Sequence, residues 1–186
     1  MPGISSVTVY CGSANGADPR YPDLARRLGK AIARRGWRTV YGGGNVGLMG
    51  CVASAARDSG GKVLGVMPHF LREIEGVLEG IENRYTDNMH QRKQALLDEA
   101  DGLVVLPGGI GTLEEAVETL SWAKLSLHRK PMAFLSENNY WQPFFVLVDH
   151  MIEGGFLPAS FRQLMANTAS PDEALDALHE RAIILD

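Results

Sequence analysis

The fold of this chain is decided by the stretch Pro107-Gly108-Gly109-Ile110-Gly111-Thr112-Leu113-Glu114-Glu115. It follows a short apolar run from Gly102 to Leu106, whose composition is typical of a fully buried strand. An amphipathic segment comes directly after it, so the stretch is expected to join a strand to a helix. Three glycines in four positions permit positive φ and leave no β-carbons to block a ligand. The free amides and positive dipole end of the helix attract an anion.

A plain helix cap is the alternative explanation for this stretch. The segment from Thr112 to Glu115 fits the capping-box pattern, in which a threonine and a glutamate cap the first turn. That pattern explains Thr112 and Glu115 but leaves the three glycines without a reason. We therefore predict a phosphate-binding loop, with a carboxylate one turn into the helix. Its expected binding residues are Gly108, Gly109, Gly111 and Thr112.

Apolar runs and amphipathic stretches alternate along the rest of the chain. This alternation predicts an α/β fold, a Rossmann-like doubly wound and mostly parallel sheet with helices on both faces. Neither a linker nor an internal repeat interrupts it, so residues 1–186 are expected to form a single domain. The expected strands are 7–10, 37–41, 62–67, a brief 84–87, 102–106 and 131–135, and the expected helices are 24–36, 46–57, a short 70–75, 89–100, 112–127, 141–153 and 171–181.

The unusual residues of the chain all follow a predicted strand and precede a predicted helix. In a parallel sheet these positions share the carboxyl edge, where ligands bind. Glycine clusters scattered at random would not favour one edge, so we expect a binding site there. The segments concerned are Gly12-Ser13, Gly42-Gly43-Gly44, Met67-Pro68, 87–92 and 107–115.

A second glycine loop runs from Gly42 to Gly47. Gly42, Gly44 and Gly47 match the G-x-G-x-x-G dinucleotide pattern in the correct strand-to-helix context. An NAD enzyme should then carry an acidic residue at the end of the next strand, but residues 62–67 contain none. A tight turn for close packing is the alternative reading. The chain also lacks the G-x-x-x-x-G-K-[ST] loop of nucleoside triphosphatases.

Basic residues stand in the first turns of the helix that begins near residue 89. Asp87 or Asn88 is the expected cap, followed by Arg92 and Lys93, where the helix dipole disfavours cations. A bound anion or a carboxylate would supply a reason for them. Glu115 and Glu118 share a face of the neighbouring helix, for which an exposed polar stripe is the alternative interpretation.

Composition limits the classes of function. Hydrophobic residues make up 45% and charged residues 22% of the chain, as in ordinary globular proteins. A formal net charge of -4 argues against a nucleic-acid binder. No apolar run reaches the ~20 residues of a membrane span, and residues 1–6 do not lead us to expect a secretory signal. Two cysteines without a metal-ligand pattern favour a cytoplasmic protein without a metal site. No cofactor is expected either.

Together these residues resemble the Lonely Guy (LOG) family of cytokinin riboside 5′-monophosphate phosphoribohydrolases. The mark of that family is P-G-G-x-G-T-x-x-E, found here at 107–115, and the similarity extends over almost the whole chain. It includes residues 10–13, 41–50, 65–68, 89–93, 122–123 and 155–157.

The resemblance implies a Rossmann-like fold, a homodimer, and hydrolysis of the N-glycosidic bond of adenine-type nucleoside 5′-monophosphates. Free base and ribose 5-phosphate would be the products. The family's catalytic arginine and glutamate fall at Arg92 and Glu115. Beside the loop itself, the positions expected to contact the nucleotide are Ser13, Gly43, Gly44, Met89, Lys93 and Glu118.

The chain departs from the family pattern at Ile110, where an aromatic residue is common, and at Lys124 and Ser126. These changes affect the expected preference for an isopentenyl-type base more than the reaction. Some relatives carry the label lysine decarboxylase. The sequence does not support that activity, because no lysine stands in a recognisable pyridoxal phosphate setting. The competing function is a non-catalytic nucleotide sensor or carrier on the same fold, which would bind nucleotide without releasing base.

Overall fold

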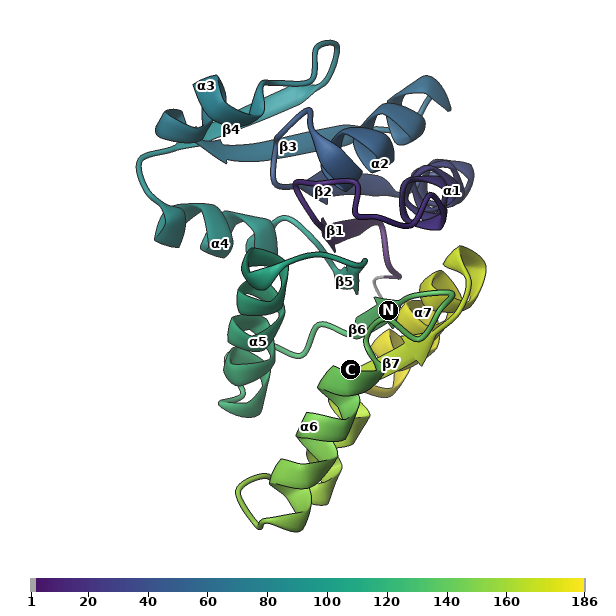
Figure 1. Cartoon of the computed structure of the whole chain (residues 1–186), viewed down its shortest axis with the longest axis vertical. Coiled ribbons are helices and arrows are strands. Elements are labelled where there is room, and N and C mark those ends of the chain that lie inside the picture. The colour runs from purple at the N-terminus through teal and green to yellow at the C-terminus, as the bar shows by residue number, and fades with distance from the viewer. Residues whose placement is uncertain (1–2, 186) are drawn as a thin grey trace.

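One parallel sheet organises the chain. The computed structural model describes residues 3–185, and in it seven strands pair in the order β4-β3-β2-β1-β5-β6-β7, with every pair parallel (Figure 1). This confirms the predicted fold class. The strands are β1 (Ser6–Tyr10), β2 (Arg38–Tyr41), β3 (Val63–Pro68), β4 (Glu82–Thr86), β5 (Gly102–Val105), β6 (Met132–Leu135) and β7 (Met165–Thr168).

Helices cover both faces of the sheet, each over its own hydrophobic core. One face carries α1 (Arg20–Arg34), α2 (Gly47–Asp58) and α7 (Pro171–Leu185). The other face carries α4 (Met89–Asp98), α5 (Ile110–Lys124) and α6 (Gln142–Glu153). Short helical segments complete the chain: η1 (His69–Leu71), α3 (Arg72–Glu75) and η2 (Ala159–Leu164).

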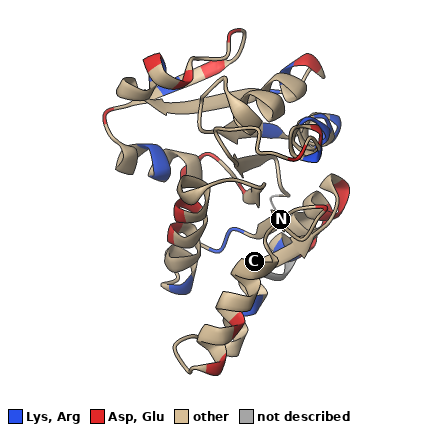
Figure 2. Cartoon of the chain, in the orientation of Figure 1, with Lys and Arg blue, Asp and Glu red and all other residues tan. Residues whose placement is uncertain are grey.

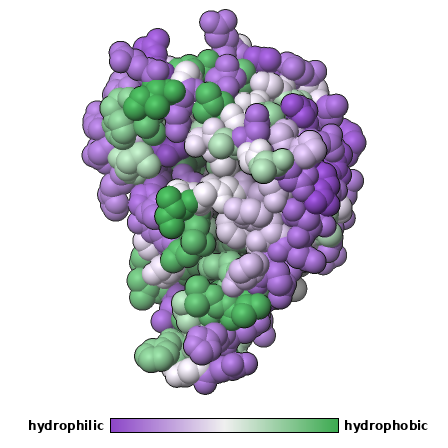
Figure 3. Space-filling model, viewed as in Figure 1, coloured by the Kyte–Doolittle hydropathy of each residue, from purple (hydrophilic) through white to green (hydrophobic). Residues whose placement is uncertain are grey.

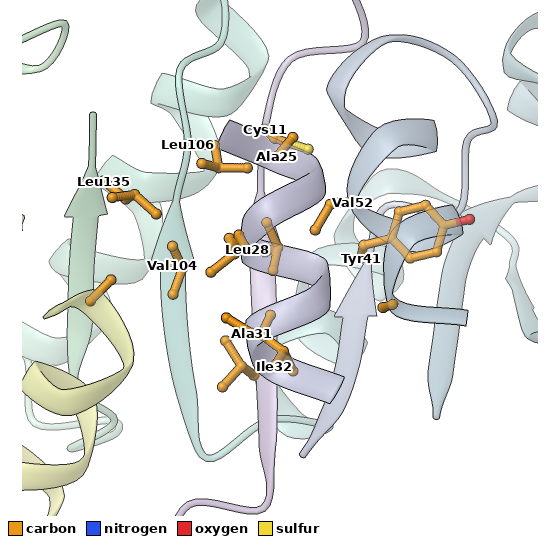
Figure 4. Packing of buried hydrophobic residues seen from close by; sticks show 14 of the residues in the cluster. Cys11, Ala25, Leu28, Ala31, Ile32, Tyr41, Val52, Val104, Leu106 and Leu135 are labelled. Carbon is orange, nitrogen blue, oxygen red and sulfur yellow. The ribbon is translucent and has the colours of Figure 1, made fainter. Parts of the chain in front are cut away.

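Alternation along the strands sends neighbouring side chains into opposite cores. In β1, Val7 and Val9 belong to the core under α1, whereas Tyr10 belongs to the core under α5. Figure 4 shows Leu28 and Ile32 of α1 packed among the strand residues of the first core. Gly29 explains how tightly α1 lies against α2, because a β-carbon there would clash with the carbonyl oxygen of Val52.

The sequence prediction was wrong about β7 and about the limits of α5. Residues 165–168 form an edge strand that the four-residue run Met-Ala-Asn-Thr, with one β-branched residue, did not signal. Helix α5 begins at Ile110 rather than Thr112. It ends at Lys124 rather than Leu127, since Ser126 adopts the left-handed conformation, with φ 60°.

The sheet has its topological switch point at β1. From β1 the chain proceeds outward through β2 and β3 on one side and through β5 and β6 on the other. At such a point the connections diverge and leave a crevice at the carboxyl ends of the strands. All five unusual segments found in the sequence do lie at this edge. No helix within the described residues is long and apolar enough to cross a membrane.

Candidate functional site

A cavity of about 300 Å³ lies at the switch point, between the ends of β1 and β5. That volume is at the lower end of the range for small-molecule sites. Larger hollows exist, such as one of about 660 Å³ beside α1 and α2, but it is lined by neither Arg92 nor Glu115. The cavity at the switch point is lined by Val9, Tyr10, Cys11, Gly12, Ser13, Gly42, Met49, Glu75, Arg92, Gly109, Ile110, Gly111, Thr112 and Glu115.

The loop before α5 presents backbone rather than side chains to this cavity. Gly109 is the N-cap of α5, and no side chain caps the helix, so its first amides remain free for an anion. The capping-box alternative was therefore wrong, because Thr112 is the third residue of the helix and not its cap. Gly108 is required for packing, since a β-carbon there would clash with Thr112 and lie 2.8 Å from the amide nitrogen of Gly12. In contrast, a β-carbon at Gly109 or Gly111 would meet nothing within 4 Å.

Arg92 is held rigidly at the far wall of the cavity. It is buried, and its guanidinium donates to two backbone carbonyls, from Nε to Val66 at 3.2 Å and from Nη2 to Gly42 at 3.1 Å. A β-carbon at Gly42 would collide with the guanidinium. The remaining nitrogen, Nη1, lies 3.6 Å from Oε1 of Glu115. Two neutral acceptors thus fix the arginine, leaving Nη1 directed toward the carboxylate.

Glu115 is a largely enclosed carboxyl group beside that arginine. Its side chain is 11% exposed, and desolvation raises its pKa from 4.5 to about 7, although the positive charge of Arg92 acts in the opposite direction. A group that titrates near neutral pH can both accept and return a proton during a reaction. Strongly shifted carboxyl groups in a cavity are candidates for catalysis.

Close packing accounts for most glycines of the second loop. Gly43 has φ 85°, and a β-carbon on it would lie 2.8 Å from the β-carbon of Met67. Gly47 has φ 57° and lies against the backbone of Ser13. The loop therefore brings β2 close to its neighbours and makes room for Arg92, as the tight-turn alternative proposed.

An ion-pair cluster joins α4 to α5 beside the cavity. Lys93 Nζ lies 2.6 Å from Glu114 Oε1 and 2.9 Å from Glu118 Oε2. Figure 2 shows this as blue on α4 close to red on α5. These ion pairs explain why Lys93 is tolerated near the start of a helix, so no bound anion is needed to account for it. At the same helix start, Asn88 is the cap, because its side chain accepts from the amide of Gln91 at 2.9 Å.

The structure brings together half of the residues singled out in the sequence. Those lining the cavity are Ser13, Arg92, Gly109, Gly111, Thr112 and Glu115. Gly108 lines an adjoining hollow instead, where its carbonyl accepts from the hydroxyl of Tyr140 at 2.6 Å. The others do not line the cavity: Gly43, Gly44, Met89, Lys93 and Glu118. Nucleotide contacts at these five positions remain predictions.

Sequence reasoning missed several lining residues, and Glu75 is the most important. It belongs to α3, in the segment after β3 that has no clear periodicity. Only the tertiary fold carries it back to the cavity. Tyr10, Cys11 and Met49 were missed as well, because each reads simply as a core residue. Among the described residues, no group of three or more His, Cys, Asp or Glu side chains could hold a metal ion.

The fold and the cavity define a Rossmann-like α/β protein with an anion-binding loop and a buried Arg–Glu pair at its switch point. A family model described as "Possible lysine decarboxylase" matches residues 49–178. Similar proteins identify the family more closely, since they are cytokinin riboside 5′-monophosphate phosphoribohydrolases. The chain belongs to this LOG family.

Two relatives show the extent of the similarity. The enzyme of Rhodococcoides fascians is 44% identical over 163 residues, which cover 87% of this chain and 82% of the relative. The LOG protein of Oryza sativa subsp. japonica is 40% identical over 176 residues, 94% of this chain and 72% of the relative. Both carry the name cytokinin riboside 5′-monophosphate phosphoribohydrolase.

Solved structures agree on the fold. The molybdenum cofactor binding protein of Rippkaea orientalis aligns with a TM-score of 0.73 at 22% identity, over 99% of each chain. The Moco carrier protein of Chlamydomonas reinhardtii aligns with a TM-score of 0.73 at 21% identity, over 96% of this chain and 98% of that chain. At such identities the likeness concerns the architecture alone.

Proposed function

We propose that this protein hydrolyses the N-glycosidic bond of adenine-type nucleoside 5′-monophosphates, including cytokinin ribotides and AMP. The observation that carries the proposal is the buried Arg92–Glu115 pair, which faces the same cavity as the uncapped start of α5. The names of the relatives at 40% and 44% identity support the same reaction. No cofactor is needed for it, because water is the second substrate.

In the proposed mechanism the 5′-phosphate binds at the start of α5, at the amides of Gly108, Gly109, Gly111 and Thr112. This anchors the ribose with its anomeric carbon near Glu115. Cleavage of the glycosidic bond builds positive charge on the ribose, which a nearby carboxylate stabilises. Glu115 also takes a proton from the attacking water as its oxygen bonds to the anomeric carbon. Arg92 orients the carboxylate and assists the departing base, which leaves with the electrons of the broken bond. The base then receives the proton that Glu115 took from water, which returns Glu115 to its carboxylate form.

The test measures release of free base and ribose 5-phosphate from AMP and from isopentenyl-AMP. We expect release by the wild type, and a loss of at least a hundredfold in kcat for Glu115→Gln, as is typical when a general base is removed. Arg92→Ala should also lower kcat strongly, because the carboxylate loses the group that orients it. Glu180→Gln, the same change at an exposed position of α7, is the control and should retain activity. Wild-type rates in both site variants would reject the assignment.

The carrier alternative predicts nucleotide binding without base release. The likeness to carrier proteins does not favour it, because that likeness shows only a shared fold. A carrier has no use for a carboxyl group whose pKa lies near 7 beside a fixed guanidinium. Calorimetry with AMP, combined with product analysis of the same sample, separates the two functions.

We also propose a homodimer, with α5 and α6 at the contact. Exposed apolar side chains gather on these helices and on the turns that follow them, and Figure 3 shows green over the lower half of the molecule, where Figure 1 places both. An apolar surface of this kind is typical of an interface. Its members are Val117, Leu125, Leu127, Val146, Leu147, Met151 and Phe156.

Further proposals follow from the charge and cysteine content. Nucleic acid is not a proposed partner, because the net charge is -4 and several α1 arginines pair with acids, such as Arg27 with Asp23 and Glu137. We propose a cytoplasmic location, supported by Cys11 and Cys51, which are both free thiols. We propose that residues 1–186 act as one catalytic domain, supported by the single continuous sheet.

A further inference from the structure

Glu75 is a third ionisable side chain in the cavity, and the mechanism above does not use it. It lies at the end of α3, seven residues beyond the last residue of β3, Pro68. The chain turns back after β3, and the backbone carbonyl of Glu75 accepts from the amide of Asn45 at 2.9 Å. This contact fixes Glu75 against the second glycine loop. Its side chain lines the cavity that holds Arg92 and Glu115.

One carboxyl oxygen of Glu75 is buried without a hydrogen-bond partner. Its Oε2 atom is buried from solvent and makes no hydrogen bond with any described residue. Burial raises the pKa of this group, and the charge of Arg92 offsets only part of the effect. Gly44 makes the close approach possible, because a β-carbon there would lie 3.0 Å from Oε2. A buried acceptor without a donor is costly, so such a group suggests a missing ligand.

Glu75 stands where it can replace the acidic residue that β3 lacks. In dinucleotide-binding folds a carboxylate beside the glycine loop hydrogen-bonds a ribose hydroxyl. Strand β3 ends without an acid, yet Glu75 places a carboxylate next to Gly44 of that loop. The carboxylate therefore comes from the following helix rather than from the strand.

We propose that Glu75 accepts hydrogen bonds from the ribose hydroxyls of the bound nucleotide and so selects ribonucleotides over sugars that lack these hydroxyls. This inference rests on the proposed function, because it requires a nucleoside monophosphate in the cavity. The phosphate binds at α5 and the ribose lies between Glu115 on one wall and Glu75 on the other. Glu75 is a substrate-binding residue that determines sugar specificity, and the hydrolytic step itself belongs to Glu115 and Arg92.

Calorimetric titrations with AMP and with 2′,3′-dideoxy-AMP test this role. They are done in the Glu115→Gln protein, so that binding is measured without turnover. We expect AMP to bind roughly ten- to a hundredfold more tightly than the dideoxy analogue, as for a hydrogen bond to a charged group. Adding Glu75→Ala should reduce this preference at least tenfold, mainly by weakening the binding of AMP. Adding Glu75→Gln should retain part of it. Glu79→Gln, an exposed acid shortly after α3, is the matched control and should keep the full preference.

Two results would overturn the inference. One is an unchanged preference for AMP in a Glu75→Ala protein whose circular dichroism and thermal unfolding match those of its parent. The other is an equal loss of affinity for both ligands, which would indicate a structural role for Glu75. The proposed function fails separately: a preserved, Glu75-dependent preference with no base release by the otherwise wild-type protein would support Glu75 and reject hydrolysis.

Discussion

Arg92 Nη1 lies 3.6 Å from Glu115 Oε1, although the two residues come from different helices and are 23 positions apart in the chain. Their side chains are only 8% and 11% exposed. A carboxyl group so enclosed would normally be neutral at pH 7, and the nearby guanidinium brings its pKa back to about 7. Burial and ion pairing therefore oppose each other, and the result is a group poised for proton transfer.

The pH dependence of kcat should report the ionisation of Glu115. The carboxylate is the form that accepts a proton from water, and its pKa is raised to about 7. We expect kcat for AMP to rise as pH increases through neutrality and to level off above it. Bound phosphate adds negative charge, so the midpoint should fall at or above 7. Initial rates at saturating AMP between pH 5.5 and 9 provide the measurement, and a flat profile would contradict this role.

Protein stability should depend on the same group with a predictable sign. Because the folded-state pKa is raised from 4.5 to about 7, the folded protein binds more protons than the unfolded chain in this window. The stability contributed by the protonated group is present below pH 4.5 and is lost as pH rises through 7. Glu115→Gln keeps a neutral side chain at every pH. Between pH 4.5 and 8, the variant should gain about 3 kcal/mol relative to the wild type, at ~1.4 kcal/mol for each pKa unit.

Urea unfolding at the two pH values measures this difference. Glu180→Gln serves as the control, since it removes an exposed carboxyl group and should show little change with pH. A Glu115→Gln variant whose advantage shrinks with rising pH would show that the ion pair with Arg92 outweighs desolvation. The variant is expected to be inactive but more stable at high pH. Glu115 would then be a residue that is needed for activity and lowers the stability of the fold.

Two glycines of the anion loop should behave in opposite ways on substitution. In Gly108→Ala the new methyl group would clash with Thr112 and crowd Gly12, and we expect a loss of about 1–3 kcal/mol of stability from overpacking. In Gly111→Ala the methyl group meets nothing within 4 Å and lies inside a helix, which alanine favours. That variant should fold normally yet bind AMP less tightly, because the methyl group stands at the cavity.

Thermal unfolding and AMP titration of both variants test the contrast. Each variant is the other's control. We expect Gly108→Ala to lower mainly the stability and Gly111→Ala to lower mainly the affinity for AMP. Equal destabilisation by both substitutions would show that the loop is structural throughout. Full AMP affinity in Gly111→Ala would show that the phosphate does not approach this part of the loop.

The proposed dimer contact can be broken by a charge. Leu147 is 50% exposed on α6 and belongs to the apolar surface shared with α5. A glutamate at this position would have to be desolvated on association, which costs several kcal/mol per ion. We expect Leu147→Glu to sediment as a monomer of 20.2 kDa and the wild type at twice that mass. A wild-type monomer, or a dimeric Leu147→Glu protein, would contradict this contact.

Much of the molecule follows from local sequence. Short apolar runs between amphipathic segments predicted six of the seven strands, because the inner strands of a parallel sheet are buried on both faces. The edge strand β7 was missed, since one β-branched residue in four gives little signal. The pairing of Arg92 with Glu115 was also anticipated in outline, because both residues stand at helix starts on the same sheet edge.

By itself the sequence determined the α/β class, the family and the sheet edge at which the candidate site was predicted, since each depends on the order of short motifs along the chain. The tertiary structure alone decided three other matters. It showed that the second glycine loop admits the guanidinium of Arg92, that Lys93 is paired with glutamates, and that Glu75 reaches the cavity. These depend on contacts between segments that fold back on one another. No local pattern encodes such contacts, because their energies arise only once the sheet has brought the segments together.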